Sequence, residues 1–249
     1  MSGNRWYEGP IEATLRDGTP VLVRMVEAED KDALAEGIAR LSARSRYLRF
    51  HTGVERLTDE QLRYLTDVDQ RDHVAWVAMT REDDGDMGIG VARFVRLPDE
   101  PDVAEAAITV LDGYQGRGLG TLLLGVLASA AIRRGVTTFR SYVLGENVGM
   151  LAVFDALGAQ RSEEEPGVYR VDLAVPRTLS GLTDAPLGKV IRAVTGRRLP
   201  RMRTTAPPVW VGEDAERPML RDWLDKVLDR TARSEGSRRR RNDSGRRTR

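Results

Sequence analysis

Apolar side chains recur along the chain with two periods, one typical of helices and one typical of strands. Leu34, Ile38 and Leu41 lie three to four positions apart, which places them on one face of a helix. The sequence Thr-Asp-Glu-Gln from Thr58 is a typical helix start, because its first and fourth side chains can cap free backbone groups. We predict helices over residues 29–41, 42–50, 119–134, 148–157 and 183–195, with a further one starting at Thr58.

Strands are predicted where β-branched and aromatic residues gather between turn residues. The order of elements is a strand, helices, three strands, and then alternating helices and strands, which predicts a mixed sheet with helices packed on it. Residues 1–18 are interpreted as a lead-in that ends in the turn Asp17-Gly18, and residues 81–86 and 163–165 as solvated turns. The predicted strands are residues 19–26, 73–80, 88–97, 103–111, 138–144 and 168–174.

Charge is distributed unevenly over the 249 residues, although the net charge is only +1. Residues 1–200 contain 25 basic and 30 acidic residues, whereas residues 201–249 contain 14 basic and 8 acidic ones. An acidic body therefore carries a basic tail. Within that tail, residues 197–218 hold four prolines and indicate a linker, residues 219–231 have an amphipathic pattern, and residues 234–249 have a composition typical of disorder.

Composition excludes several classes of site. The chain contains no cysteine, so it has no disulfides, no thiolate metal ligands and no cysteine nucleophile. Its two histidines, His51 and His73, leave little material for a histidine metal site, and we expect no metal. The longest uncharged stretch has 15 residues, fewer than the ~18 expected of a membrane span. No secretory leader is visible, so we expect a cytoplasmic protein without a membrane partner.

The most informative stretch is the glycine-rich loop Gln115-Gly116-Arg117-Gly118-Leu119-Gly120-Thr121, which joins a predicted strand to a predicted helix. A helix N-terminus leaves its first backbone N–H groups unpaired, and these donors attract phosphates. Glycine lets a diphosphate approach the backbone because no Cβ blocks it, and Arg117 adds a positive charge. The spacing completes neither a dinucleotide fingerprint nor a P-loop. A glycine-rich turn without a ligand is the alternative interpretation.

This loop, with its flanking strand and helix, resembles motif A of the GNAT acetyltransferase superfamily, in which the loop holds the diphosphate of acetyl-CoA. Downstream, Asn147 and the residues after it are similar to the GNAT segment in which an Asn faces the coenzyme. Upstream segments resemble the catalytic domain of bacterial, including actinobacterial, protein-lysine acetyltransferases. The segments that carry the resemblance are residues 16–18, 41–50, 65–75, 115–120 and 146–158.

The resemblance implies a mixed α/β fold of the GNAT type, with a mostly antiparallel central sheet of six to seven strands flanked by helices and followed by a C-terminal helical extension. We expect the GNAT domain over residues 12–175, a helical extension with a Pro-rich linker over 176–233, and a disordered Arg-rich tail over 234–249. Acetyl-CoA is the expected acyl donor. Regulation by a cyclic nucleotide, which some actinobacterial enzymes of this group have, is not carried over.

Glu105 is the only acidic residue in the apolar run 103–107. Burial among apolar residues raises the pKa of a carboxyl toward neutrality. A free lysine has a pKa near ~10.4, so a base that removes its proton is useful at neutral pH. In the lysine acetyltransferase domains that the chain resembles, a Glu at the matching position is the general base, directly or through water. The alternative is a Glu on a solvent-facing side of the strand.

The resemblance also implies a site for the pantetheine arm of acetyl-CoA. Backbone N–H groups near Ile108, Thr109 and Val110 are expected to hold this arm and to polarise the thioester carbonyl. Asn147 can hydrogen bond to the pantetheine, and it can equally cap a helix. Phe154 stands where many GNAT enzymes have a Tyr that protonates the leaving thiolate, which leaves the general acid open.

These observations predict an acetyl-CoA-dependent N-acetyltransferase, with a protein lysine as the favoured acceptor. A small-molecule amine is the alternative acceptor, because one fold serves many substrates. A non-catalytic acyl-CoA sensor is the alternative class, and Phe154 is consistent with it. Nucleic-acid binding by the basic tail is not favoured, because few aromatic residues are interleaved with the arginines for stacking. The sequence does not indicate an oligomeric state.

Overall fold

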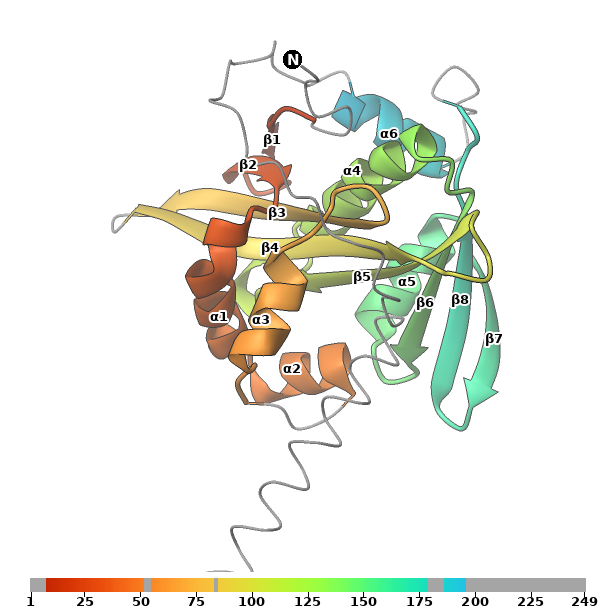
Figure 1. Cartoon of the computed structure of the whole chain (residues 1–249), viewed down its shortest axis with the longest axis horizontal. Helices are drawn as coiled ribbons and strands as arrows, with labels where there is room; N and C mark the ends of the chain where they lie inside the picture. Colours follow the sequence, from red (N-terminus) through yellow and green to blue (C-terminus); the bar gives the residue numbers. More distant parts are fainter. Residues whose placement is uncertain (1–7, 52–54, 83–84, 179–185, 196–249) are drawn as a thin grey trace, which may run out of the picture. The chain divides into compact units, whose positions relative to one another are not determined.

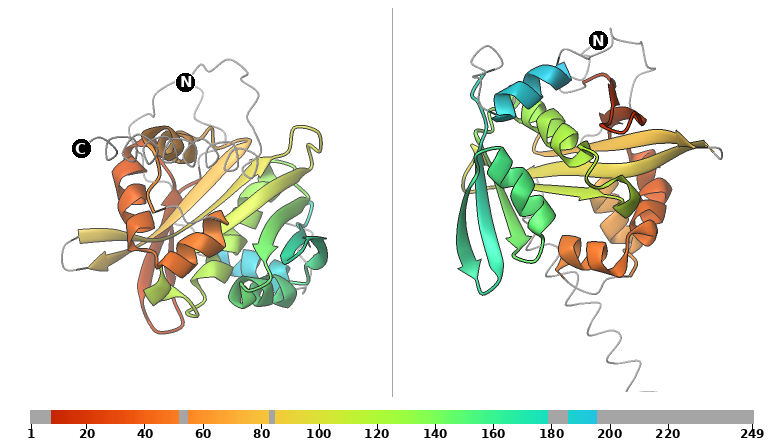
Figure 2. Two further views of the ribbon diagram at one scale, coloured as in Figure 1. Left: turned by 90° about the horizontal axis from the view of Figure 1, so that it is seen from below. Right: turned by 180° about the vertical axis from the view of Figure 1, so that it is seen from behind.

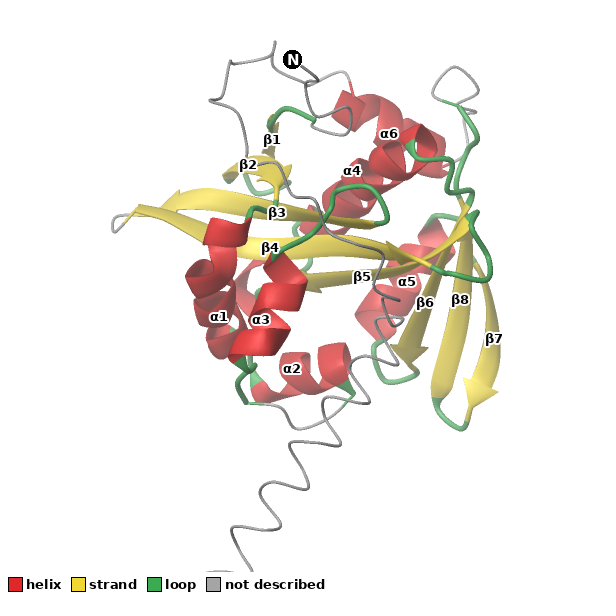
Figure 3. Ribbon diagram, in the orientation of Figure 1, coloured by secondary structure: helices red, strands yellow, loops and turns green. Residues whose placement is uncertain are grey.

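The computed structural model describes residues 8–51, 55–82, 85–178 and 186–195 (Figure 3). Two short 3-10 turns, Ala28–Asp30 and Asp112–Tyr114, supplement the regular elements. The strands are β1 (Ile11–Thr14), β2 (Pro20–Met25), β3 (His73–Glu82), β4 (Gly85–Arg96), β5 (Val103–Val110), β6 (Thr138–Leu144), β7 (Gln160–Glu165) and β8 (Val168–Ala174). The helices are α1 (Lys31–Arg40), α2 (Ala43–Phe50), α3 (Asp59–Thr66), α4 (Leu119–Arg133), α5 (Val148–Ala156) and α6 (Pro186–Thr195).

The described strands form one sheet in the order β1-β2-β3-β4-β5-β6-β8-β7 (Figure 1). Neighbouring strands are antiparallel except β5 and β6, which run parallel and are joined through α4. A parallel pair needs such a crossover connection, whereas antiparallel neighbours need only a turn. The predicted mixed, mostly antiparallel sheet with flanking helices is confirmed.

Helices cover both faces of the sheet (Figures 1 and 2). On one face, called here the α4–α5 face, α4 and α5 pack on the strands and α6 packs on α4 through Leu187 and Ile191. A Cβ at Gly90 of β4 would lie 3.1 Å from the side chain of Leu123, so this glycine permits the close approach of α4. On the other face, the α1–α3 face, α1 packs on β4 and on α3.

Side chains alternate between the two faces along each strand. Phe94 and Phe139 belong to the core of the α4–α5 face, with ring centroids 5.8 Å apart. Their neighbours in sequence, Arg93 and Arg140, therefore lie on the α1–α3 face. The same alternation places Glu105 on the α1–α3 face, because Ala104 and Ala106 belong to the opposite core.

Two strands were not predicted, so the sheet has eight described strands rather than six to seven. β1 has only four residues, and we interpreted its segment as a lead-in. The prediction of a solvated turn at residues 163–165 is wrong, because these glutamates belong to β7, an edge strand whose residues are all exposed. The turn predicted over residues 81–86 is also shorter, since Arg81 pairs with Asp86 in the ladder. β7 buries no side chain and so has no apolar alternation to detect, whereas β1 does alternate, with Ile11 and Ala13 buried, but is only four residues long.

The helix starts follow the sequence closely. Thr58 caps α3 in a capping box with Gln61, as its spacing predicted. Ser42 caps α2 by accepting a hydrogen bond from the Ser45 N–H at 3.1 Å. None of the helices within the described residues has the length and apolar composition needed to cross a membrane. The amphipathic segment 219–231 and the tail 234–249 lie outside the described residues.

Candidate active site

The sheet opens between β5 and β6. The two strands pair at only three positions, of which Glu105 with Arg140 is the last, and they then diverge (Figure 1). At the point of divergence the Ser141 hydroxyl donates to the carbonyl of Ala106 at 2.7 Å. This side-chain hydrogen bond takes the place of the next backbone pairing between the strands. Beyond it, β5 and β6 no longer pair with each other.

Along β5, the backbone N–H and C=O groups of successive residues point alternately toward β4 and toward the opening. Leu111 donates to Ile89, and Leu97 donates to Val103, so the odd-numbered residues of β5 bond to β4. In an antiparallel pair the residues between them point to the other edge. The N–H groups of Ile108 and Val110 therefore face the opening. Thr109 differs from the expectation in this respect, because its backbone belongs to the β4 ladder and its side chain faces α2.

The glycine loop lies beside this edge and begins α4. Gly116 and Gly118 have φ values of 72° and 91°, a left-handed conformation that only glycine adopts without strain. Gly118 is the N-cap of α4, and its carbonyl accepts from Leu122 at 3.0 Å. A Cβ at Gly120 would meet no atom within 4 Å, so the space in front of the first helical turn is open. The loop thus presents the helix N-terminus that an anion requires.

The turn between β1 and β2 packs against this loop. The Arg16 N–H donates to the Arg117 carbonyl at 3.1 Å, and the Arg117 guanidinium pairs with the Asp17 carboxylate at 2.6 Å. The Arg117 side chain also lies over the Tyr114 ring, 5.0 Å from its centroid. Hydrogen bonds from Thr19, and then the charge of Arg117, hold the pKa of Asp17 below its ordinary value. Arg117 therefore lies along the outer side of the loop.

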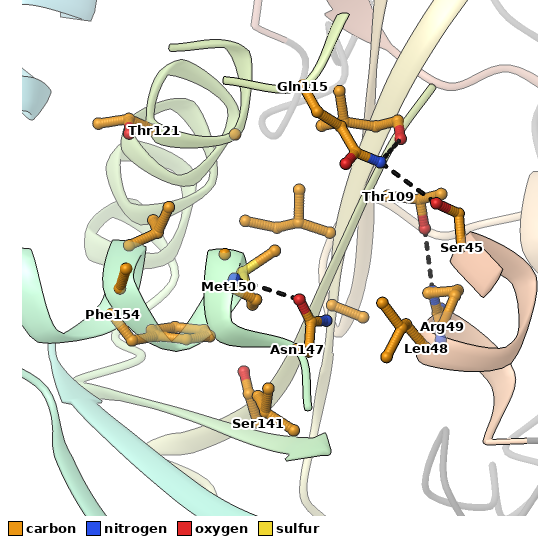
Figure 4. A pocket seen from close by; sticks show the side chains of 18 of the residues that line it. Ser45, Leu48, Arg49, Thr109, Gln115, Thr121, Ser141, Asn147, Met150 and Phe154 are labelled. Carbon is orange, nitrogen blue, oxygen red and sulfur yellow. Dashed lines mark hydrogen bonds between the residues drawn. The ribbon is translucent and has the colours of Figure 1, made fainter. Parts of the chain in front are cut away.

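A cleft of about 480 Å³ runs along the opening (Figure 4). Because residues of both strand faces line it, among them Ala106 and Ala107, the cleft passes through the sheet rather than along one side. Figure 4 shows Asn147 and Met150 on one side of it and Ser45, Leu48 and Arg49 on the other. The remaining lining residues are Arg16, Ile108, Thr109, Val110, Gln115, Gly116, Gly118, Gly120, Thr121, Ser141, Tyr142, Val143, Gly149, Ala152, Val153, Phe154 and Ala156.

One wall of the cleft is α2, and the loop after β5 holds it in place. Asp112 accepts hydrogen bonds from the Ser42 N–H at 3.0 Å and from the hydroxyls of Ser42 and Ser45 at 2.8 Å. Burial alone would raise the pKa of Asp112, but these hydrogen bonds outweigh it and the pKa is lowered. The Gln115 side chain bridges Ser45 and the Val110 carbonyl at 3.3 and 3.1 Å (Figure 4).

The opposite wall is α5. The Asn147 side chain caps this helix by accepting from the Met150 N–H at 3.2 Å, and it also lines the cleft; its hydrogen bond to a pantetheine stays a prediction. Phe154 is 3% exposed and lines the cleft from the next turn of the helix. This wall is mainly apolar, and it faces the edge of β5 that carries the free N–H groups.

Two arginines on the α1–α3 face, Arg49 of α2 and Arg93 of β4, lie near the cleft. The Arg49 Nε donates to the Thr109 hydroxyl at 3.0 Å, and burial of the guanidinium lowers the pKa of Arg49 to about 10, against the charge of Glu105, which raises it. Arg93 donates to the Leu65 carbonyl at 3.0 Å and lies 3.3 Å from the His73 ring nitrogen. Burial and the like charge of Arg49 lower the pKa of Arg93 to about 9. Both guanidiniums are protonated at neutral pH.

The structure brings most of the predicted residues together. Glu105 is 7% exposed, lies beside the cleft rather than in its lining, and interacts electrostatically with Arg49. Leu119 is 1% exposed and packs into the core, so only its backbone can face an anion. Arg117 is turned away toward Asp17. Within the described residues, no three histidine or carboxylate side chains are grouped so that they could hold a metal ion.

Sequence reasoning missed Arg16, Arg49, Arg93 and Asp112. Arg16 and Arg49 lie in segments that carried the resemblance, but nothing in their local pattern indicated that they reach the cleft. Arg93 stands between the apolar pairs Val91-Ala92 and Phe94-Val95, a pattern similar to the one that singled out Glu105, and it could have been found in that way.

A family model for the acetyltransferase (GNAT) domain matches residues 21–160, which include the opening, the glycine loop and α5. The chain belongs to the GNAT acetyltransferase family. Acetyltransferase Pat of Mycolicibacterium smegmatis is 37% identical over 197 residues, which are 75% of this chain and 57% of Pat. Acetyltransferase PA5475 of Pseudomonas aeruginosa is 32% identical over 158 residues, which are 64% of this chain and 82% of the relative.

The GNAT fold is also found by comparison with solved structures. The crystal structure of the GNAT domain of S. lividans PAT matches 68% of this chain and 97% of that domain, with a TM-score of 0.62 and 30% identity. The chain spans only 57% of the length of Pat, so the similarity leaves much of Pat unmatched.

Proposed function

We propose that this chain transfers the acetyl group of acetyl-CoA to an amine, with a protein lysine side chain as the favoured acceptor. The observation that carries the proposal is the opening between β5 and β6, which meets the glycine loop at one end and reaches Glu105 at the other. An acyl donor and an amine can meet there from the two faces of the sheet. The GNAT domain is proposed to cover residues 12–175, and residues 176–233 and 234–249 are proposed as an extension and a tail.

The residues present fit acetyl-CoA. The left-handed glycines at positions 116 and 118 and the open space at Gly120 let a diphosphate reach the first N–H groups of α4. The N–H groups of Ile108 and Val110 can bind the amides of the pantetheine arm as a neighbouring strand would. A donor at this edge also polarises the thioester carbonyl and stabilises the negative charge that develops on its oxygen.

Glu105 is proposed as the base. It accepts a proton from the acceptor ammonium through water, because it lies beside the cleft and not in its lining. The neutral nitrogen then forms a bond to the thioester carbon, the carbon–sulfur bond breaks, and the nitrogen loses a second proton. Arg49, a neighbour of Glu105, lies close enough for the two charges to interact.

No tyrosine stands at the position from which many GNAT enzymes protonate the leaving thiolate. Phe154 occupies this part of α5, so we propose that water returns the proton to sulfur. A CoA thiol is a far better leaving group than an amine, because its pKa is near that of an ordinary thiol, ~8.5. A side-chain acid is therefore not essential for this step.

The protein acceptor rests on similarity. Acetyltransferase Pat and the GNAT domain of S. lividans PAT are 37% and 30% identical to this chain over the matched residues, and upstream segments of this chain resemble protein-lysine acetyltransferases. A small amine is the competing acceptor. A sensor without turnover is the competing class, and the apolar Phe154 at the thiolate end is the observation that favours it.

Release of CoA from acetyl-CoA tests the proposal, with a lysine-rich protein as one acceptor and a panel of small amines as others. Acceptor acetylation is followed by mass spectrometry. The native chain should acetylate the protein, and Glu105→Gln should lower kcat about 100-fold at pH 7 while retaining CoA binding. The deficit should shrink as the pH rises toward 9, because more acceptor amine is then already neutral.

Each alternative gives a different result. Turnover on small amines alone would replace the protein acceptor, and tight CoA binding without turnover on any acceptor would establish the sensor. Full activity of Glu105→Gln from pH 7 to pH 9 would show that Glu105 is not the base. The matched control is Glu60→Gln on α3, an exposed carboxylate outside the cleft lining.

A further inference from the structure

We propose that Arg16, in the turn between β1 and β2, supplies the positive charge that binds the diphosphate of the acyl donor, in place of the loop residue Arg117. This inference rests on the proposed function, because it assigns a residue of the same donor site. It concerns a residue 99 positions upstream of Gln115, the first residue of the glycine loop.

The turn is built so that each of its residues has a different contact. Leu15 is 6% exposed and anchors the turn in the core of the sheet. Asp17 pairs with Arg117 and also accepts from the Thr19 N–H at 3.0 Å. Gly18 has a φ of 90° and closes the turn through its N–H bond to Leu15. Together with the Arg16 N–H bond to Arg117, these contacts fix the position from which the Arg16 side chain leaves the turn.

From that position Arg16 reaches the cleft across the glycine loop. A Cβ placed on Gly118 would lie 3.4 Å from the Arg16 Nε and 3.6 Å from its Cγ, so the side chain passes directly over the N-cap of α4. Arg16 also lines the cleft together with Gly116 and Gly120. Its guanidinium is therefore next to the N–H groups that the proposed function assigns to the diphosphate.

The two arginines beside the glycine loop, Arg16 and Arg117, differ in how far their charge is compensated. Arg117 is paired with the Asp17 carboxylate at 2.6 Å and stacked on Tyr114, so its charge is largely compensated. Arg16 is exposed, and within the described residues its side chain has neither an ion pair nor a hydrogen-bond partner. A guanidinium presents donors that match the oxygens of a phosphate, and the positive end of the α4 dipole adds to its attraction.

The chemistry that Arg16 would recognise is a diphosphate on the donor, so the test compares donors with and without it. CoA and pantetheine share the thiol arm but only CoA has the diphosphate. Calorimetry with the full chain should give a CoA dissociation constant about 10-fold higher for Arg16→Met than for the native chain, and an unchanged constant for pantetheine. Arg16→Lys should lose only about 3-fold, because it keeps the charge but not the fork of donors.

Salt dependence is a second readout that a packing role would not change. The affinity of the native chain for CoA should fall with rising salt, and that of Arg16→Met should fall less steeply, because one ionic contact is missing. Arg44→Met is the matched control: Arg44 is an exposed arginine on α2 that does not line the cleft, and this variant should bind CoA as the native chain does.

Three outcomes would overturn the inference. Native affinity of Arg16→Met for CoA at low salt would show that its charge is not used. An equal loss for CoA and pantetheine would assign Arg16 to packing on Gly118 instead. A larger loss of CoA affinity in Arg117→Met than in Arg16→Met would return the role to the loop. If the native chain itself binds no CoA, the proposed function fails first, and the two failures are thereby distinguished.

Discussion

The two faces of the sheet bury different kinds of side chain. On the α4–α5 face the buried residues are mainly apolar, and Phe94 packs on Phe139 there. On the α1–α3 face, Arg93, His73 and Glu105 are buried among apolar neighbours, at 2%, 1% and 7% exposure. Apolar burial contributes stability in proportion to area, whereas buried polar groups depend on their partners. Buried charge is not confined to that face, since Arg134 at the end of α4 pairs with the buried Glu8 at 2.9 Å, but Arg93 and Glu105 place buried charge on the α1–α3 face near the opening between β5 and β6.

The strongest test of this comparison uses two adjacent residues of β4 that point to opposite faces. Phe94→Ala should lower the free energy of unfolding by about 3–5 kcal/mol, because it leaves a cavity in the apolar core. Arg93→Met should cost about 1–3 kcal/mol, because the Leu65 carbonyl and His73 lose a donor while the volume is nearly kept. Urea unfolding followed by circular dichroism measures both.

The result for Arg93 can break the comparison. Buried charged groups can often be replaced by apolar ones of similar size without loss of stability. An Arg93→Met chain as stable as the native one would show that the polar groups of the α1–α3 face do not hold this face together.

Arg49 tests whether the polar face serves the reaction. Arg49→Met removes the hydrogen bond to Thr109 and the charge beside Glu105. We expect kcat to fall about 10- to 100-fold, equivalent to about 1.4–2.8 kcal/mol, with the CoA dissociation constant changed less than twofold. Steady-state kinetics and calorimetry separate the two quantities. Arg44→Met on the same helix is the control, and a parallel loss of kcat and CoA affinity would assign Arg49 to donor binding.

Two glycines of the loop, Gly118 and Gly120, test the α4–α5 side of the comparison. Gly118→Ala should cost about 1–2 kcal/mol of stability, because an alanine there would have to adopt a left-handed conformation. Gly120→Ala should keep or slightly raise stability, because its Cβ meets no atom and alanine favours helix. Both should weaken CoA binding. Gly120→Ala with native CoA affinity would show that the diphosphate does not approach the backbone at this turn.

The smallest expected effect concerns Asp112, whose hydrogen bonds with Ser42 and Ser45 hold α2 against the turn after β5. The pKa of Asp112 is lowered in the folded chain from an ordinary value of 3.8, so its stabilising contribution is present above about pH 4 and is lost as the pH falls through the lowered pKa. Asp112→Asn should cost about 1 kcal/mol at pH 7, and the difference from the native chain should shrink as the pH falls below about 4. Urea midpoints at pH 7, 5 and 3 measure this.

The exposed Asp99 on the β4–β5 connection provides the matched control for that series. Asp99→Asn should unfold at the native urea concentration at all three pH values. A difference at pH 7 as large as that of Asp112→Asn would indicate a general effect of surface charge and not the contact with Ser42 and Ser45.

Local sequence predicted the α4–α5 side far better than the α1–α3 side. The glycine loop and the N-cap Asn147 each depend on a few consecutive residues, so their environment can be inferred from spacing. The polar face joins α2 at residues 43–50 to β5 at residues 103–110, and no local pattern records that contact. The role of Arg117 was inferred from its position in the motif, but Asp17, 100 residues away, pairs with it.

The same reasoning explains why the edge strand β7 was not predicted. β7 is stabilised by its ladder with β8 and not by burial, so its run of glutamates gave no sign of a strand. Periodicity reports which side chains are buried, and it is therefore silent about a strand that buries none.

Only three residue pairs join β5 to β6. The ladders on either side are longer, since β4 and β5 are held by seven pairs and β6 and β8 by seven. Fewer backbone pairs therefore join β5 to β6 than join either strand to its other neighbour. A ligand that bonded to the free edge of β5 while resting on α5 would bridge the two parts of the sheet across this short ladder.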